Sequence, residues 1–141
     1  MEEELLKKAL ENNKNETILK LDSYKLNEYK IELLEQLNVK KTKQKEILKK
    51  LKHYRLIKDI NEINLGSYIR WIPLKKRENI YVTNGGIICD IKQVNEDISI
   101  VCKNNMNNIF QLKMSECIIF QKLSNQEQIL LSVIDYVNKN E

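Results

Sequence analysis

The chain has 141 residues, of which 42% are hydrophobic and 31% charged, with only three glycines and one proline. This composition is ordinary for a folded protein with one core, and it excludes flexible linkers and low-complexity tracts. No apolar run approaches the roughly 20 residues of a membrane-spanning helix. The start, Met1-Glu-Glu-Glu, lacks the basic and apolar regions of a signal peptide. We therefore expect a protein that is neither secreted nor bound in a membrane.

The net charge of +4 is unevenly distributed. Residues 40–58 contain nine basic residues and one acidic residue, whereas residues 1–39 contain six basic and nine acidic residues. A second basic group, Lys75-Lys76-Arg77, follows the first predicted strand. The positive charge of the chain is thus concentrated in one segment and one loop.

Helices are predicted before the strands. Residues 3–10 have leucines at helical spacing, but so short a helix must either dock or fray. Asp22-Ser23 offers an N-cap for a helix to about Val39. Thr42 can cap a further helix to about Tyr54. These two segments form either an antiparallel hairpin, leucine against leucine, or one long helix. The sequence leaves open whether they dock on the strands.

Five short strands are predicted between residues 66 and 121. They span residues 68–74, 80–94, 98–103, 109–114 and 117–121. Asn84-Gly85-Gly86 is the strongest turn or bulge signal, because Asn and Gly tolerate positive φ. In the second strand, alternation places Ile87, Cys89 and Ile91 on one face.

A closing helix is predicted at about residues 125–138. Ser124 and Glu127 have the spacing of a capping box. The apolar stripe of this helix must be buried against the strands or against the first helices. The sequence therefore predicts an α+β fold with an N-terminal helical hairpin (residues 1–58), a five-stranded barrel (59–123) and a C-terminal helix packed on it (124–141).

The strands carry a resemblance to a known class of fold. Gly66-Ser-Tyr-Ile-Arg-Trp-Ile72 and Gly86-Ile-Ile-Cys-Asp-Ile91 resemble the Gly-x-x-Val-Arg-Val and Gly-x-Ile-x-x-Ile strands of SH3-like small barrels of the Tudor, KOW and chromo-barrel type. The resemblance covers about residues 66–121 and implies a five-stranded SH3-like β-barrel. Separately, the stretches GSYIRWI, TNGGIICDI and CIIFQKLSNQEQILLSVIDY are similar to uncharacterised small proteins of giant nucleocytoplasmic DNA viruses. That similarity implies a location in the cytoplasm, at the viral factory, or in the virion, and implies no activity.

The sequence offers no set of catalytic or metal-binding residues. His53 is the single histidine and lies in a basic helix, where a solvated side chain is expected. Cys89, Cys102 and Cys117 lie in predicted strands without C-x-x-C spacing, which indicates reduced, buried thiols. We therefore predict no enzyme activity, no cofactor and no bound metal.

Nucleic-acid binding is the function that the charge distribution favours. Basic side chains clustered in one segment contact phosphates and give affinity without sequence specificity. The alternative is a solvated, lysine-rich helix face. The candidate residues, for DNA or RNA alike, are Lys40, Lys41, Lys43, Lys45, Lys49, Lys50, Lys52, Arg55, Lys75, Lys76 and Arg77.

Two further interpretations stay open. Tyr68, Trp71 and Tyr81 could form an aromatic surface or cage for a cationic peptide group, although Trp71 shares a face with Ile69 and is more simply a core residue. Alternatively, the leucine-striped helices and the barrel surface could assemble with a protein partner or with another copy of the chain. Assembly through such apolar surfaces would persist at high salt, whereas phosphate binding would weaken steeply as the salt concentration rises.

Overall fold

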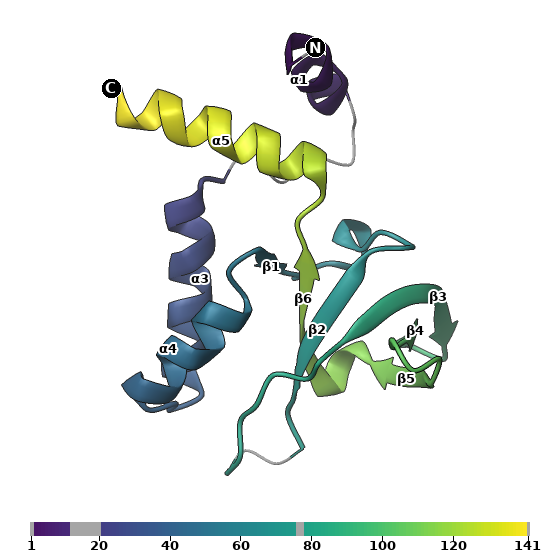
Figure 1. Cartoon of the computed structure of the whole chain (residues 1–141). Coiled ribbons are helices and arrows are strands. Elements are labelled where there is room, and N and C mark those ends of the chain that lie inside the picture. The colour runs from purple at the N-terminus through teal and green to yellow at the C-terminus, as the bar shows by residue number, and fades with distance from the viewer. Residues whose placement is uncertain (1, 12–20, 76–77, 141) are drawn as a thin grey trace.

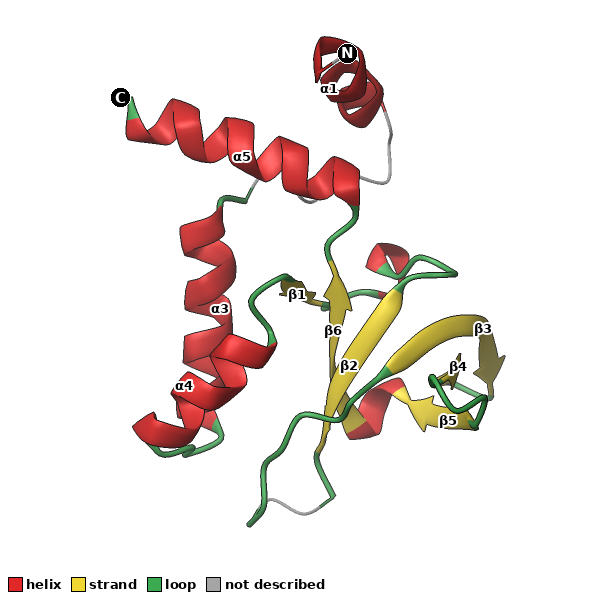
Figure 2. Cartoon of the chain, in the orientation of Figure 1, coloured by secondary structure: helices red, strands yellow, loops and turns green. Residues whose placement is uncertain are grey.

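The computed structural model describes residues 2–11, 21–75 and 78–140. In this part of the chain the predicted α+β class is confirmed: four helices accompany one six-stranded antiparallel sheet (Figures 1 and 2). The helices are α1 (Glu2–Glu11), α3 (Ser23–Gln36), α4 (Lys41–Lys50) and α5 (Asn125–Lys139). The strands are β1 (Tyr54–Leu56), β2 (Tyr68–Pro73), β3 (Gly86–Val94), β4 (Asp97–Lys103), β5 (Ile109–Lys113) and β6 (Cys117–Lys122). Short 3₁₀ turns lie at Ile60–Glu62 and Met114–Glu116.

The sheet is open. Its strand order is β1-β6-β2-β3-β4-β5, so β1 and β5 are the two edges. The predicted closed five-stranded barrel is therefore not confirmed. The sixth strand, β1, pairs Tyr54 with Lys122 and Leu56 with Phe120. Because these residues join the sheet, the helix predicted to reach Tyr54 ends at Lys50 instead.

The second predicted strand starts later than expected and contains a bulge. Strand β3 begins only at Gly86, and the preceding residues run alongside β2, where the Thr83 amide donates to the Trp71 carbonyl at 3.0 Å. The register shifts between Ile88 and Asp90, which interrupts the two-residue alternation. Ahead of this shift Ile88 is buried, whereas Ile87 and Cys89 on either side of it are exposed, so the prediction that Cys89 is a core thiol is wrong.

Helices α3 and α4 dock on the sheet. Asp22 caps α3 as predicted, accepting from the Lys25 amide at 2.7 Å. Lys40, and not Thr42, occupies the N-cap position of α4. The apolar stripes of both helices are buried against the β1-β6-β2 side of the sheet (Figure 1). This cluster comprises Leu34, Ile47, Leu51, Ile72, Ile80, Val82 and Phe120.

The C-terminal helix packs on other helices and does not lie on the sheet. The predicted capping box is confirmed: Ser124 Oγ accepts from the Glu127 amide at 3.1 Å, and the Glu127 carboxylate accepts from the Ser124 amide at 3.0 Å. Helix α5 crosses the start of α3 (Figure 1), and its Leu130 and Leu131 are buried with Leu26 and Ala9. The prediction that this helix packs on a barrel is therefore corrected. Helix α1 joins this helical cluster through its buried residue Ala9.

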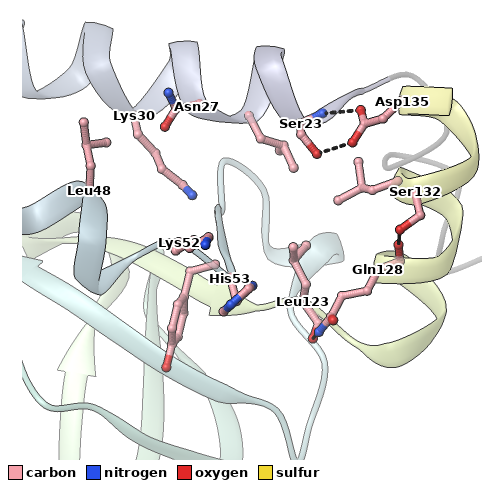
Figure 3. A pocket seen from close by; sticks show the side chains of 13 residues that line it. Ser23, Asn27, Lys30, Leu48, Lys52, His53, Leu123, Gln128, Ser132 and Asp135 are labelled. Carbon is pink, nitrogen blue, oxygen red and sulfur yellow. Dashed lines mark hydrogen bonds between the residues drawn. The ribbon is translucent and has the colours of Figure 1, made fainter. Parts of the chain in front are cut away.

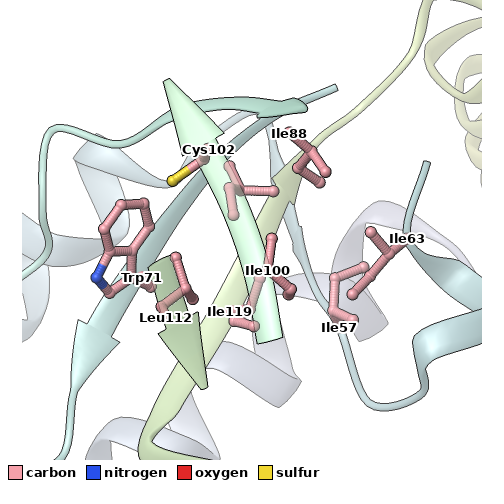
Figure 4. Close-up of a cluster of buried hydrophobic side chains, with 9 residues drawn as sticks. Ile57, Ile63, Trp71, Ile88, Ile100, Cys102, Leu112 and Ile119 are labelled. Atoms are coloured by element: carbon pink, nitrogen blue, oxygen red, sulfur yellow. The ribbon is translucent and has the colours of Figure 1, made fainter. Parts of the chain in front are cut away.

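A second apolar core fills the concave side of the curved sheet (Figure 4). Ile100 and Cys102, two residues apart on β4, are fully buried there, and the prediction that Cys102 is a buried thiol is confirmed. Trp71 and Ile119 extend this core from β2 and β6. Since their neighbours Ile72 and Phe120 are buried against α3 and α4, the centre of the sheet is covered on both faces, which makes it a rigid support for α4.

Candidate nucleic-acid interface

The basic segment forms α4 and the turn that follows it. The helix is anchored on its apolar side by Ile47 and Gln44, whose Nε2 donates to the Val39 carbonyl at 2.8 Å. Lys41, Lys45 and Lys49 lie on the exposed side. Because they are four residues apart they share one helix face, with a rise of about 6 Å between neighbours. Lys52 is exposed in the turn and continues this row. We call these four residues the lysine row.

The remaining lysines of the segment flank the row. Lys40 is exposed at the start of α4, and Lys50 is exposed at its end. Lys43 is half-buried, and its Nζ lies 3.4 Å from Asn79 Oδ1 in the β2–β3 loop. The Lys50 carbonyl accepts from the Arg70 guanidinium on β2, also at 3.4 Å. These contacts bring the β2–β3 loop beside α4.

The β2–β3 loop holds the second predicted basic group. Lys75 is exposed, and its Nζ lies 3.7 Å from a Glu116 oxygen, an arrangement of two solvated side chains that contributes little to stability. Lys76 and Arg77 lie outside the described residues. Of this group, the structure therefore places only Lys75.

No lysine of the row forms an ion pair in the described part of the chain, although Glu46 is exposed on the same helix, three residues before Lys49. The ion pairs there join Arg55 to Glu62 and Glu127, and Lys75 to Glu116. Each lysine ammonium of the row is therefore free to contact an external anion.

Arg55 does not belong to this surface, and its prediction as a phosphate contact is wrong. It lies on β1 with 3% of its surface exposed. Its Nη1 donates to Glu127 Oε2 at 2.9 Å, and its Nη2 pairs with Glu62. A guanidinium buried between two carboxylates is a structural group, because phosphate could reach it only by breaking both pairs.

The three predicted aromatic residues do not share one environment. Trp71 is buried in the sheet core and also lines a cleft of about 360 Å³ with Lys75 and Glu116. Tyr68 is half-buried, and its hydroxyl donates to the Asn84 carbonyl at 2.6 Å. Tyr81 is exposed. Neither tyrosine lines the cleft beside Trp71, so these residues do not converge on one cation.

The titratable thiols and the histidine are dispersed. Burial raises the pKa of the Cys102 thiol to about 11 and also raises the pKa of Cys117. Cys89 and His53 are exposed. Within the described ranges, no three His, Cys, Asp or Glu side chains gather in a way that could hold a metal ion. The same ranges contain no helix with the length and apolar character to cross a bilayer.

Sequence reasoning missed one charged residue, Lys30. It is buried on α3, with 4% of its surface exposed, and its Nζ donates to the Leu51 carbonyl at 2.7 Å. A signal was present, because Lys30 lies four residues after Leu26 and four before Leu34, both of which are buried. It therefore occupies the apolar stripe of its helix.

Comparisons with models of known protein families, with curated proteins and with solved structures find no match for this chain.

Proposed function

We propose that this protein is a non-catalytic nucleic-acid-binding module that contacts phosphates through the lysine row of α4. The observation that carries the proposal is that Lys41, Lys45 and Lys49 share one exposed helix face with no described acidic partner. Ammonium groups on such a face neutralise phosphates and release counterions, which gives affinity for DNA or RNA without reading the bases.

The scaffold supports this role. Helix α4 is held on the sheet by Ile47 and Leu51, so the row is presented on a rigid element. The contact between Lys43 and Asn79 places part of the β2–β3 loop at the flank of α4, whereas Lys75 of the same loop lies beside Glu116 and Trp71. The SH3-like character of the sheet is part of the same proposal: consecutive antiparallel pairing from β2 to β5 and the curvature of β3 (Figure 1) support it. The origin in a giant virus stays a prediction.

The test compares two triple variants that lose the same charge. K41Q/K45Q/K49Q removes three lysines of the row, and K92Q/K103Q/K113Q removes three exposed lysines from the sheet. Binding to labelled DNA and RNA, single-stranded and duplex, is measured by fluorescence anisotropy at about 50 mM salt, where phosphate contacts are strong. The proposal predicts a loss of about tenfold or more for the first variant and a much smaller loss for the second. Equal losses would mean that only net charge matters.

A second candidate function, protein assembly, is favoured by one edge of the sheet. Strand β5 is an unpaired edge, and Ile109 on it is 71% exposed. Exposed apolar edge strands pair readily with other chains. The leucine stripes of α3 and α4, in contrast, are already buried against the sheet and are not available for a partner. Sedimentation of the wild type and of Ile109→Lys tests this candidate function. A wild-type oligomer that the substitution dissociates would support it, and a monomeric wild type would exclude self-assembly.

A further inference from the structure

A cleft with a volume of about 440 Å³ lies between α3, the turn after α4, and α5 (Figure 3). This volume is in the range of pockets that hold small organic molecules. Part of its lining is apolar and suits the body of such a molecule. The apolar lining residues are Leu26, Leu48, Tyr54, Leu123 and Leu131.

The buried lysine described above is part of this lining. Lys30 Nζ donates to the Leu51 carbonyl, and among the described residues no carboxylate forms an ion pair with it. An ammonium has three donors, so two remain. A buried charge without a counter-ion is costly, and burial lowers the pKa of Lys30 to about 8. An anion in the cleft would supply the missing counter-charge.

Two further basic side chains lie on the same side of the cleft. Lys52 and His53, from the turn after α4, lie near Lys30 in Figure 3, and both are exposed. The carboxylate in the lining, Asp135, is at the other end, beside Ser23 (Figure 3). Its Oδ1 accepts from the Ser23 amide at 3.0 Å, and its Oδ2 accepts from Ser23 Oγ at 2.6 Å. Asp135 is held at that end by Ser23 and forms no ion pair with Lys30.

We propose that the cleft binds a phosphate monoester, with Lys30 as the buried anchor of the phosphate and Lys52 at its exposed oxygens. A phosphate monoester fits better than a carboxylate, because it carries a charge near −2 at neutral pH and three acceptor oxygens, which match two ammonium groups. His53 adds a donor at the rim. The apolar lining contacts the organic part of the ligand.

The position of the cleft suggests two sources for this phosphate. Lys52 belongs both to the cleft and to the lysine row, and Leu48 of α4 lines the cleft, so the cleft lies at the C-terminal end of the row. The occupant is therefore either a free nucleotide or the terminal phosphate of a bound strand. Binding of a free nucleotide stands independently of the proposed function, because Lys30 is no part of the lysine row, whereas binding of a strand end rests on that function.

The experiment uses the full chain in phosphate-free buffer. The probes are inorganic phosphate, adenosine monophosphate and adenosine, titrated by calorimetry or by NMR chemical shifts. We expect a response to both phosphate probes and none to adenosine. Lys30→Met should weaken binding of adenosine monophosphate by about tenfold or more, the value of one charged hydrogen-bonding partner. Lys25→Met, an exposed lysine on the same helix outside the cleft, should leave binding unchanged.

A second variant guards against a folding defect in Lys30→Met. Lys52 is exposed, so Lys52→Met should fold normally and still weaken binding several-fold, as expected for a partly solvated charge contact. The proposal is overturned if neither phosphate probe binds, if adenosine binds as well as adenosine monophosphate, or if the Lys52 variant binds like the wild type.

The source of the phosphate is distinguished with short single strands that end in either a phosphate or a hydroxyl. Tighter binding of the phosphorylated strand, lost in Lys30→Met, identifies a strand end as the occupant. Equal binding of the two strands, with adenosine monophosphate still bound, identifies a free nucleotide. Failure of the proposed function is a separate result, since it removes strand binding while adenosine monophosphate still binds.

Discussion

Arg55 connects three parts of the fold, and its replacement by Met tests how much this connection stabilises the protein. Its two Nη atoms reach Glu127 at the start of α5 and Glu62 in the 3₁₀ turn after β1. Both glutamates are also caps: Glu127 accepts from the Ser124 amide at 3.0 Å, and Glu62 accepts from the Asp59 amide, also at 3.0 Å. The guanidinium therefore holds two capping carboxylates in place.

The expected cost follows from burial. Arg55 and Glu127 are each 3% exposed, so Arg55→Met leaves a carboxylate buried without its partner. Breaking a buried pair in this way costs about 3–5 kcal/mol, a large part of the roughly 5–15 kcal/mol that stabilises a domain. With a urea m-value of about 2 kcal/mol/M, the unfolding midpoint should fall by roughly 2 M.

The assay is urea unfolding followed by the fluorescence of Trp71, the single tryptophan, which is buried in the sheet core. Lys49→Met, an exposed control, should change the free energy of unfolding by less than about 0.5 kcal/mol. The double variant R55M/E127Q also removes the charge of the unpaired Glu127 carboxylate and should recover part of the lost free energy of unfolding. A loss below about 1 kcal/mol for Arg55→Met, or a double variant no more stable than the single one, would refute the reasoning.

Three further predictions concern other described residues. The pKa of Lys30 in the folded state is about 8, below its ordinary value of 10.5, so between these pH values the folded protein binds fewer protons than the unfolded chain. The free energy of unfolding of the wild type, relative to that of Lys30→Met, should therefore rise by roughly 3 kcal/mol at most from pH 7 to 10.5. A difference between the two free energies that does not change with pH would contradict this. Alkylation followed by mass spectrometry should modify exposed Cys89 rapidly, while Cys102, buried and with its pKa raised to about 11, should react only on unfolding; equal rates would contradict the placement. Gly85 and Gly66 both have positive φ, but a Cβ on Gly85 would lie 2.0 Å from a β2 carbonyl oxygen, whereas a Cβ on Gly66 would meet nothing within 4 Å. In urea unfolding, Gly66→Ala should lower the free energy of unfolding by about 1–2 kcal/mol and Gly85→Ala by clearly more. Equal losses would exclude the clash at Gly85.

Local signals in the sequence were sufficient for several elements. The cap at Asp22 and the capping box at Ser124 depend on residues within one helical turn, and both are present. Ile100 and Cys102 lie two residues apart on β4 and are both fully buried, as expected for apolar side chains on one face of a strand, although Ser99 is buried as well. Such features need no information from distant parts of the chain.

Features that depend on distant residues were not predictable. Strand β1 exists because Tyr54–Leu56 pairs with β6, more than sixty residues away, while its own residues continue a helical pattern. Alternation places Ile87 and Cys89 on one face of β3, but only the packing of the sheet shows that this face is exposed and that Ile88 enters the core. Arg55 looked like one more member of a basic segment, and only the approach of Glu62 and Glu127 reveals its structural role.

The candidate site was predicted in part. The lysines of α4 are exposed because the stripe opposite them is apolar, a pattern that the sequence contains. The proximity of the β2–β3 loop to α4, through Lys43 and Asn79, is a tertiary contact without a sequence signal. Lys30 had a weak signal, its place between Leu26 and Leu34, but the cleft that it lines forms only when α5 crosses α3.

The salt dependence of nucleic-acid binding tests the central claim most directly. Affinity for a DNA duplex is measured at several salt concentrations between about 50 and 200 mM, and the logarithm of the association constant is plotted against the logarithm of the salt concentration. If the four lysines of the row each neutralise one phosphate, the slope should be about −3.6, and K41Q/K45Q/K49Q should reduce its magnitude by about 2.7. Binding that does not change with salt, or a slope that the triple variant leaves unchanged, would contradict phosphate contact through α4.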